Sequence, residues 1–116
     1  MKTHTGSCHC GAVTYTVTAD IEKVIECNCT HCSRKGFLLA FVPAEQFALI
    51  TGEDNLTEYR FNKMHIAHRF CKTCGVQCFG QAKDKDGNDT VAINVRTLSD
   101  IDLSTLTIEK FDGKSY

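Results

Sequence analysis

The cysteines of this sequence stand at spacings that suit metal ligands. There are 8 of them, arranged as a C-x-C pair, a C-x-C-x-x-C triplet, a C-x-x-C-G pair and one further residue: Cys8 and Cys10; Cys27, Cys29 and Cys32; Cys71 and Cys74; and Cys78. Thiolates one or two residues apart can turn their sulfurs onto one ion about 2.3 Å away, and two such pairs complete a tetrahedron around Zn²⁺. The sequence therefore predicts a fold built around zinc.

We expect the first and the last pair to hold one zinc ion together. Cys8 and Cys10 lie at the start of an expected strand, and Cys71 and Cys74 lie between two others, beside Gly75. A glycine there can take the positive φ that lets the backbone wrap around a metal. Four thiolates leave no position for a substrate, which is typical of a structural site. A redox pair would need a βαβ context, and small buried hydrophobes would not need this spacing.

The triplet leaves a set of three ligands. Zinc held by three protein groups keeps a fourth position for water or a substrate atom, which is the arrangement of catalytic zinc. We therefore assign the catalytic role to Cys27, Cys29 and Cys32. The alternative is a second closed site, in which one further residue supplies the fourth ligand. The candidates for it are Cys78, His31, His65 and His68.

Period-two alternation dominates the rest of the chain and predicts strands. Between residues 13 and 17, valine and tyrosine alternate with threonine, as in a half-buried strand. Further strands are expected at residues 24–27, 37–42, 47–51, 56–61, 65–71, 76–81 and 90–98. Helical turns are expected at 30–35 and 43–47, and a turn at 83–89, where an Asp-Gly step interrupts a polar run. The sequence therefore predicts an all-β fold in a single domain, residues 1–116, with the cysteines on its connections.

Charge and composition argue against several classes of function. The chain carries 13 Lys plus Arg and 14 Asp plus Glu, so no bulk charge would attract a nucleic acid or an acidic membrane surface. No run of about 18 apolar residues could span a bilayer, and polar residues 1–7 do not resemble an export signal. We therefore expect a soluble, cytoplasmic protein with reduced thiols rather than a disulfide framework.

Three cysteine motifs follow one another in order: GSCHCGAV at 6–13, CNCTHCSRKG at 27–36 and FCKTCG at 70–75. The segments FVP at 41–43, VAINVR at 91–96 and FDG at 111–113 accompany them. Together these motifs resemble the GFA family, the glutathione-dependent formaldehyde-activating enzymes, a group that includes centromere protein V. The resemblance spans nearly the whole chain.

The resemblance implies a β-tent fold of small antiparallel sheets with zinc sites on the connections. It also implies two zinc ions per chain, a structural one on Cys8, Cys10, Cys71 and Cys74 and a catalytic one on Cys27, Cys29 and Cys32. The founding activity of the family joins formaldehyde and glutathione into S-hydroxymethylglutathione, and its reverse is a lyase reaction. We therefore expect a zinc-dependent carbon–sulfur lyase whose partners are a small thiol such as glutathione and an aldehyde.

Other interpretations of the same residues remain. The alternative function is a zinc-stabilised protein-binding module without catalysis, because one fold can serve both roles. Arg34 and Lys35 follow the triplet directly and could hold a carboxylate of glutathione, although solvated turn charges are the plainer interpretation. His65 and His68 are three residues apart on one expected strand and should face opposite sides of it.

Overall fold

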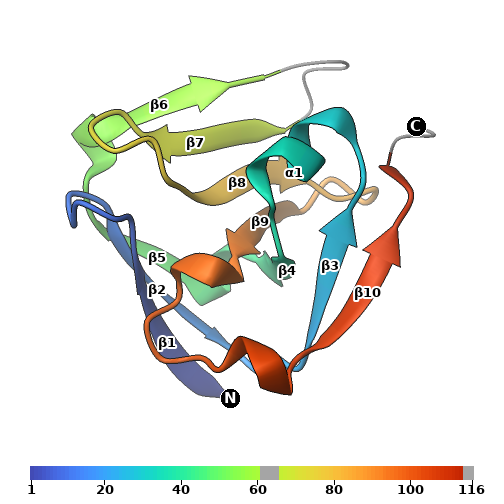
Figure 1. Cartoon of the computed structure of the whole chain (residues 1–116). Coiled ribbons are helices and arrows are strands. Elements are labelled where there is room, and N and C mark those ends of the chain that lie inside the picture. The colour runs from blue at the N-terminus through green and yellow to red at the C-terminus, as the bar shows by residue number, and fades with distance from the viewer. Residues whose placement is uncertain (61–65, 114–116) are drawn as a thin grey trace.

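The computed structural model describes residues 1–60 and 66–113, which form ten strands and one α-helix (Figure 1). Four 3₁₀ turns connect some of them: η1 (Ala44–Gln46), η2 (Glu53–Asn55), η3 (Val95–Thr97) and η4 (Leu103–Thr105). The strands and the helix are β1 (Lys2–Ser7), β2 (Thr14–Ala19), β3 (Lys23–Cys27), α1 (Thr30–Lys35), β4 (Leu39–Pro43), β5 (Phe47–Thr51), β6 (Leu56–Tyr59), β7 (Ala67–Cys71), β8 (Gln77–Lys83), β9 (Asp89–Asn94) and β10 (Thr107–Phe111). Among the described residues, no helix is long and apolar enough to cross a membrane.

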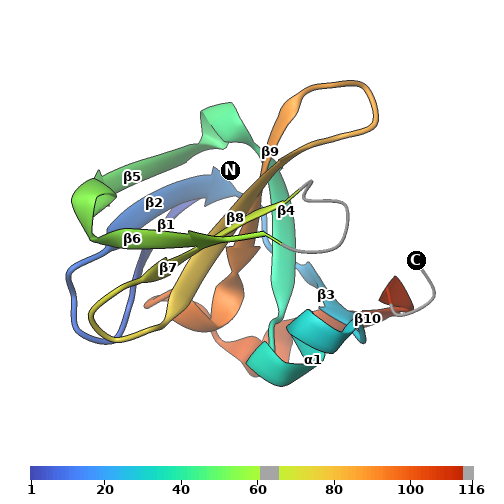
Figure 2. The same ribbon diagram turned by 90° about the horizontal axis from the view of Figure 1, so that it is seen from above.

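The strands form two sheets, and the expected all-β, β-tent fold is confirmed. One sheet has the order β1-β2-β5 and the other β10-β3-β4-β9-β8-β7-β6. Every named pair is antiparallel except β10 and β3, which run parallel side by side at one edge, as both views show (Figures 1 and 2). The last strand of the chain therefore ends beside Cys27.

The core lies between the two sheets. On β2 the alternation expected at 13–17 is confirmed, because Tyr15 and Val17 are buried while the threonines between them stay partly exposed. The Tyr15 ring stacks on Phe47 with 5.5 Å between centroids, and Phe47 in turn lies 4.7 Å from Phe79 of the larger sheet. The Tyr15 hydroxyl and the Thr97 hydroxyl are 2.7 Å apart. This aromatic chain fixes the small sheet on the large one.

Several boundaries differ from the sequence-based expectation. Strands β1 and β10 were not expected, because neither shows a clear apolar alternation. The strand expected at 90–98 ends at Asn94, whose side chain accepts the N–H of Arg96 and starts the turn η3. The helical turn expected at 43–47 is the short 3₁₀ turn Ala44–Gln46. The expected strands 56–61 and 65–71 extend partly outside the described residues. His65, a candidate ligand, also lies outside them.

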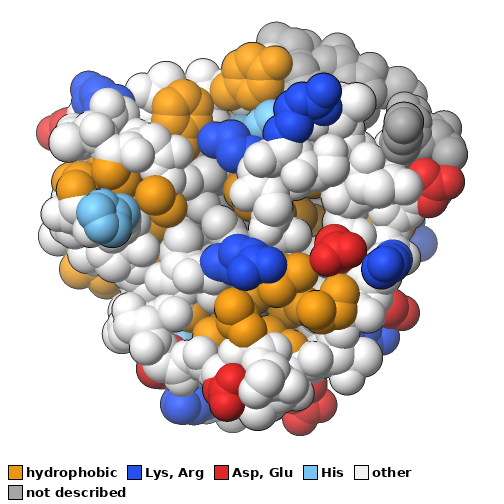
Figure 3. All heavy atoms as spheres, viewed as in Figure 1, with side chains coloured by type: hydrophobic (Ala, Val, Ile, Leu, Met, Phe, Trp, Pro, Cys, Tyr) orange, Lys and Arg blue, Asp and Glu red, His pale blue; other side chains and the backbone are white. Residues whose placement is uncertain are grey.

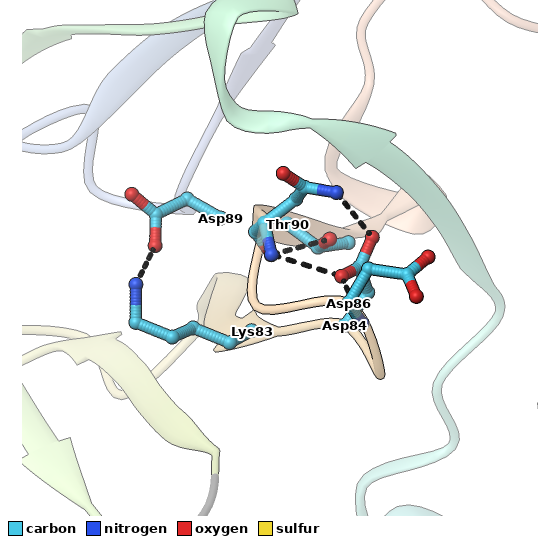
Figure 4. A network of polar contacts seen from close by, with 6 residues as sticks. Lys83, Asp84, Asp86, Asp89 and Thr90 are labelled. Atoms are coloured by element: carbon cyan, nitrogen blue, oxygen red, sulfur yellow. Dashed lines mark hydrogen bonds and ion pairs between the residues drawn. The ribbon is translucent and has the colours of Figure 1, made fainter.

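The turn expected at 83–89 connects β8 and β9 (Figure 4). The Asp84 carboxylate accepts the backbone N–H groups of Asp86 and Asn88, both at 2.9 Å. Lys83 and Asp89 close the strand ends with an ion pair of 2.7 Å. Carboxylate-to-backbone bonds of this kind replace the ladder bonds that a hairpin loses at its turn. The contacts that hold this turn are therefore between residues close in sequence.

Candidate metal centre and its pocket

Four thiols from two distant loops meet between the sheets. Cys8 and Cys10 lie in the β1–β2 connection, whereas Cys71 ends β7 and Cys74 lies in the turn to β8. Their sulfurs all lie within 4.8 Å of one another. The Cys10 Sγ is 3.7 Å from the Cys8 Sγ and 3.6 Å from the Cys71 Sγ. This four-thiol cluster links the small sheet to the large one.

Both loops curl around their first cysteine in the same way. Gly11 and Gly75 take φ of 84° and 80°, values that side-chain-bearing residues rarely adopt. The resulting curvature lets the backbone N–H of Val13 donate to the Cys8 sulfur at 3.3 Å. The backbone N–H of Cys74 lowers the pKa of Cys71 to about 6, against the opposing effect of burial. N–H groups aimed at sulfur favour the thiolate form that a metal requires.

The spacing of these sulfurs fits zinc. A tetrahedral site with Zn–S bonds of about 2.3 Å has S–S edges of about 3.8 Å, close to the 3.6 and 3.7 Å found in the four-thiol cluster. Thiols are also the donors that soft and borderline ions prefer. All eight cysteines of the chain are free, so no disulfide competes for them.

A second, three-thiol cluster consists of Cys27, Cys29 and Cys32, whose sulfurs also lie within 4.8 Å of one another. Cys27 ends β3, Cys29 is the N-cap of α1 and Cys32 lies within that helix. The Cys29 sulfur accepts the N–H of Cys32 at 3.2 Å, as a capping side chain does. Gly36, with φ of 71°, ends the helix. The helix expected at 30–35 is thereby confirmed, and its first turn brings the sulfurs of Cys29 and Cys32 to that of Cys27 at the end of β3.

The protonation of the three-thiol cluster is uneven. Burial is the largest single influence on Cys29 and acts to raise its pKa. Hydrogen bonds from the backbone N–H groups of Cys32 and His31 and from the thiols of Cys32 and Cys27 together outweigh burial, so the net shift of the pKa is downward. Burial dominates for Cys32 and raises its pKa. A metal ion at this site therefore meets one thiol that loses its proton more readily than an ordinary cysteine, Cys29, and one buried thiol that holds its proton more tightly, Cys32.

A pocket of about 530 Å³ opens beside the three-thiol cluster. Cys27 and Cys32 line it, together with the rings of Phe37 and Phe111. Phe37 is buried at 3% exposure, whereas Phe111 is 43% exposed. The volume lies in the range of small-molecule sites. Two thiols of this cluster thus face a space that could admit a ligand.

The segment 111–113, where β10 ends, lies against Cys27. The Asn28 N–H donates to the Phe111 carbonyl at 3.1 Å, and the Asn28 side-chain amide donates to Asp112 at 3.0 Å. At Gly113 an added Cβ would overlap the Cys27 sulfur and would lie 3.4 Å from the Cys29 Cβ. A glycine is therefore required at 113 by close approach to the cluster, not by its backbone angles.

The histidines proposed as fourth ligands occupy another position. The ring of His31 contacts those of His68 on β7 and Tyr59 on β6, with centroids 4.2 and 5.6 Å apart. Burial lowers the pKa of His68 to about 4 and also lowers that of His31. Among the described residues no histidine belongs to either metal-competent group. These two rings attach α1 to the large sheet.

Cys78 lies in the core on the side of the four-thiol cluster. It is 1% exposed and packs in the same apolar cluster as Cys8 and Cys71. Burial raises its pKa to about 12, and Cys8 and Cys74 add electrostatic repulsion in the same direction. The structure therefore removes Cys78 as a ligand that closes the three-thiol cluster.

The cations near the pocket are not the expected ones. Arg34 donates to the Thr30 carbonyl of its own helix at 2.9 Å, and the Lys35 ammonium lies 5.0 Å from the centre of the Phe70 ring. Neither lines the pocket, whereas Arg96 and Lys110 do. Sequence reasoning missed both, because Arg96 lies in a distant turn and Lys110 on an unexpected strand. The VAINVR segment at 91–96 was the available signal for Arg96 alone.

The fold and its two thiol clusters define a β protein organised around candidate metal centres. The chain belongs to the GFA family, the glutathione-dependent formaldehyde-activating enzymes, to which residues 3–111 match. This family is associated with enzymatic activation of formaldehyde. The crystal structure of a Rhodobacter sphaeroides protein is also similar, with a TM-score of 0.77 and 26% identity, covering 90% of this chain and 99% of that chain.

Substituting Gly113→Ala should weaken metal binding at the three-thiol cluster without unfolding the protein. The added carbon meets the Cys27 sulfur, so either the sulfur or the chain end must move. Titration with Co²⁺, followed by thiolate charge-transfer absorption, measures binding, and a thermal melt reports stability. Gly80→Ala is the matched control, because its added carbon meets nothing closer than 3.5 Å. Equal Co²⁺ affinity in the Gly113→Ala variant and the wild type would contradict the close approach.

Proposed function

We propose that this protein is a zinc-dependent carbon–sulfur lyase that makes and breaks the adduct of a thiol, such as glutathione, with a small aldehyde, such as formaldehyde. The observation that carries the proposal is the position of Cys27 and Cys32 on the wall of a pocket. A group of three thiols that faces a ligand-sized space is the arrangement expected of a catalytic metal. The GFA family match supports the same thiol and aldehyde.

The two clusters then have different roles. In this proposal the four-thiol cluster holds a closed, structural zinc, since four thiolates complete a tetrahedron. Cys27, Cys29 and Cys32 hold the second zinc, which makes about two ions per chain. A cytoplasmic location suits this arrangement, because the cytosol keeps such thiols reduced.

The reaction balances without an oxidant or a reductant. The thiol sulfur forms a bond to the carbonyl carbon, the C=O π electrons move to oxygen, and the proton released by the thiol is taken up there to give a hydroxyl. The reverse steps release aldehyde and thiol. When bound, zinc lowers the pKa of a coordinated thiol and polarises a carbonyl oxygen.

The residues of the chain position the three thiols and exclude water from the pocket. Cys29 and Cys32 are held by the first turn of α1, and Cys27 is held by the end of β3 and by its close approach to Gly113. Phe37 and Phe111 give the pocket apolar walls. Such walls lower the local dielectric constant, which strengthens electrostatic interactions with the reacting oxygen.

Glutathione should change the visible spectrum of the Co²⁺-substituted protein. An open position at the three-thiol cluster accepts an external thiolate and alters the ligand field, whereas the four-thiol cluster has no position to offer. Addition of formaldehyde should then form S-hydroxymethylglutathione, measured by NMR, faster than the uncatalysed mixture does. If the spectrum does not change and the rate does not increase, the enzyme proposal is refuted and the binding module is favoured.

A further inference from the structure

The pocket beside the three-thiol cluster carries charges of both signs. Its lining includes two cations, Arg96 and Lys110, and two acids, Glu26 and Asp112. They come from three parts of the chain that are distant in sequence: β3, η3, and the end of β10 with the residue that follows it. Figure 1 shows α1, β3 and β10 together on one side of the molecule. Figure 3 shows the same side with its side chains, and Lys and Arg side chains lie there beside a central hydrophobic patch.

Arg96 is held in place with most of its donors still available. Its Nε donates to the Gly36 carbonyl at 2.9 Å, which ties the guanidinium to the end of α1. No ion pair involves it within residues 1–60 and 66–113. A guanidinium offers five N–H donors, and its terminal nitrogens match the two oxygens of a carboxylate. The hydrogen bond from Nε therefore orients the two terminal nitrogens of Arg96 toward a bound anion.

Lys110 is brought to the pocket by the parallel pairing of β10 with β3. Its register partner is Glu26, yet no ion pair joins these two residues in the described part of the chain. Lys110 is solvent-exposed and forms no other ion pair with a described residue. Its ammonium is therefore available to a ligand, and Glu26 is available to a ligand cation.

We infer that Arg96 and Lys110 bind the two carboxylates of a small peptide thiol, which makes this pocket selective for a dianionic thiol over a neutral one. This inference rests on the proposed function, because it places the thiol of that substrate at Cys27 and Cys32. Glutathione carries two carboxylates and one ammonium at neutral pH. The pocket presents two cations to the carboxylates and Glu26 to the ammonium. The volume of about 530 Å³ accommodates a tripeptide.

Binding of S-methylglutathione, measured by calorimetry, tests this assignment. The methylated sulfur cannot ionise, so affinity reports the pocket charges and not metal-bound thiolate. Arg96→Gln and Lys110→Gln should each weaken binding by about five- to tenfold, as expected for loss of a charge-assisted hydrogen bond at a partly solvated site. Binding should also weaken with added salt. Lys35→Gln, which removes a cation outside the pocket, should bind as the wild type does.

The outcomes separate this inference from the proposed function. Wild-type affinity in both glutamine variants, or an equal loss in Lys35→Gln, overturns it, and so does absence of binding to the wild type. If Arg96→Gln fails to fold because the bond to Gly36 is lost, the exposed Lys110→Gln still decides the question. Binding that depends on both cations, together with no turnover of formaldehyde, keeps the pocket assignment and rejects the lyase.

Discussion

Replacing Cys10 by serine should cost the protein most of its stability. Cys10 is an exposed residue of the four-thiol cluster, and exposed substitutions ordinarily change stability by less than about 0.5 kcal/mol. Structural zinc sites contribute about 10 to 16 kcal/mol to folding. Even a third of that is comparable with the whole stability of a small protein, about 5 to 15 kcal/mol. A large loss at so exposed a side chain would therefore come from the metal.

Thermal melts and zinc analysis check this result together. The Cys10→Ser variant should melt far below the wild type and retain about one zinc per chain in place of about two. Ser7→Ala, at the end of β1, removes a hydrogen bond to the Cys8 carbonyl but no sulfur ligand, and serves as the control for changes beside the cluster. A variant that melts with the wild type would show that the four-thiol cluster is not structural.

Replacing Cys29 by serine should abolish turnover and leave the fold intact. Serine is a favoured N-cap, so its hydroxyl can accept the Cys32 N–H that the Cys29 sulfur now accepts, and the stability change should stay within about 1 kcal/mol. The serine is a poor zinc ligand, however. Loss of partners that merely orient metal ligands costs about 10- to 100-fold in activity, so loss of a ligand should cost more than about a hundredfold.

Rate measurements beside melts separate the two clusters. Thr30→Ala, an exposed position in the same helix that supplies no ligand and lies outside the pocket lining, should retain both stability and rate. If Cys29→Ser unfolds the protein while Cys10→Ser remains folded, the structural and catalytic assignments are exchanged. If Cys29→Ser keeps the wild-type rate, the reaction does not occur at the three-thiol cluster.

The grouping of the cysteines could be predicted because ligand spacing is a local property. A C-x-C or C-x-x-C segment brings its sulfurs together whatever the rest of the chain does, and positive-φ glycines beside Cys10 and Cys74 reinforce the pattern. The role of Cys78 could not be predicted in the same way. Its position in an alternating strand allows either a ligand or a core residue, and only the packing of two sheets decides for the core.

The surroundings of the three-thiol cluster depend on contacts that no local pattern encodes. Strand β10 has exposed residues along its whole length, so its sequence lacks the alternation that marks a half-buried strand. Its parallel register with β3 is nevertheless what brings Lys110 and Phe111 to the pocket. Arg96 arrives through a turn that Asn94 initiates. Tertiary strand pairing, and not local propensity, therefore brings these residues to the pocket.

The separation of the ligands along the chain sets an order for folding. The three-thiol cluster spans six positions of sequence, from the end of β3 to the first turn of α1, so it can form before any long-range contact exists. Cys10 and Cys71 are 61 positions apart, and closing such a loop has an entropic cost that only the meeting of both sheets offsets. In the proposed two-zinc protein, an ion bound early by the three-thiol cluster would stabilise the first turn of α1. An ion at the four-thiol cluster would bind late and would hold the assembled sheets together.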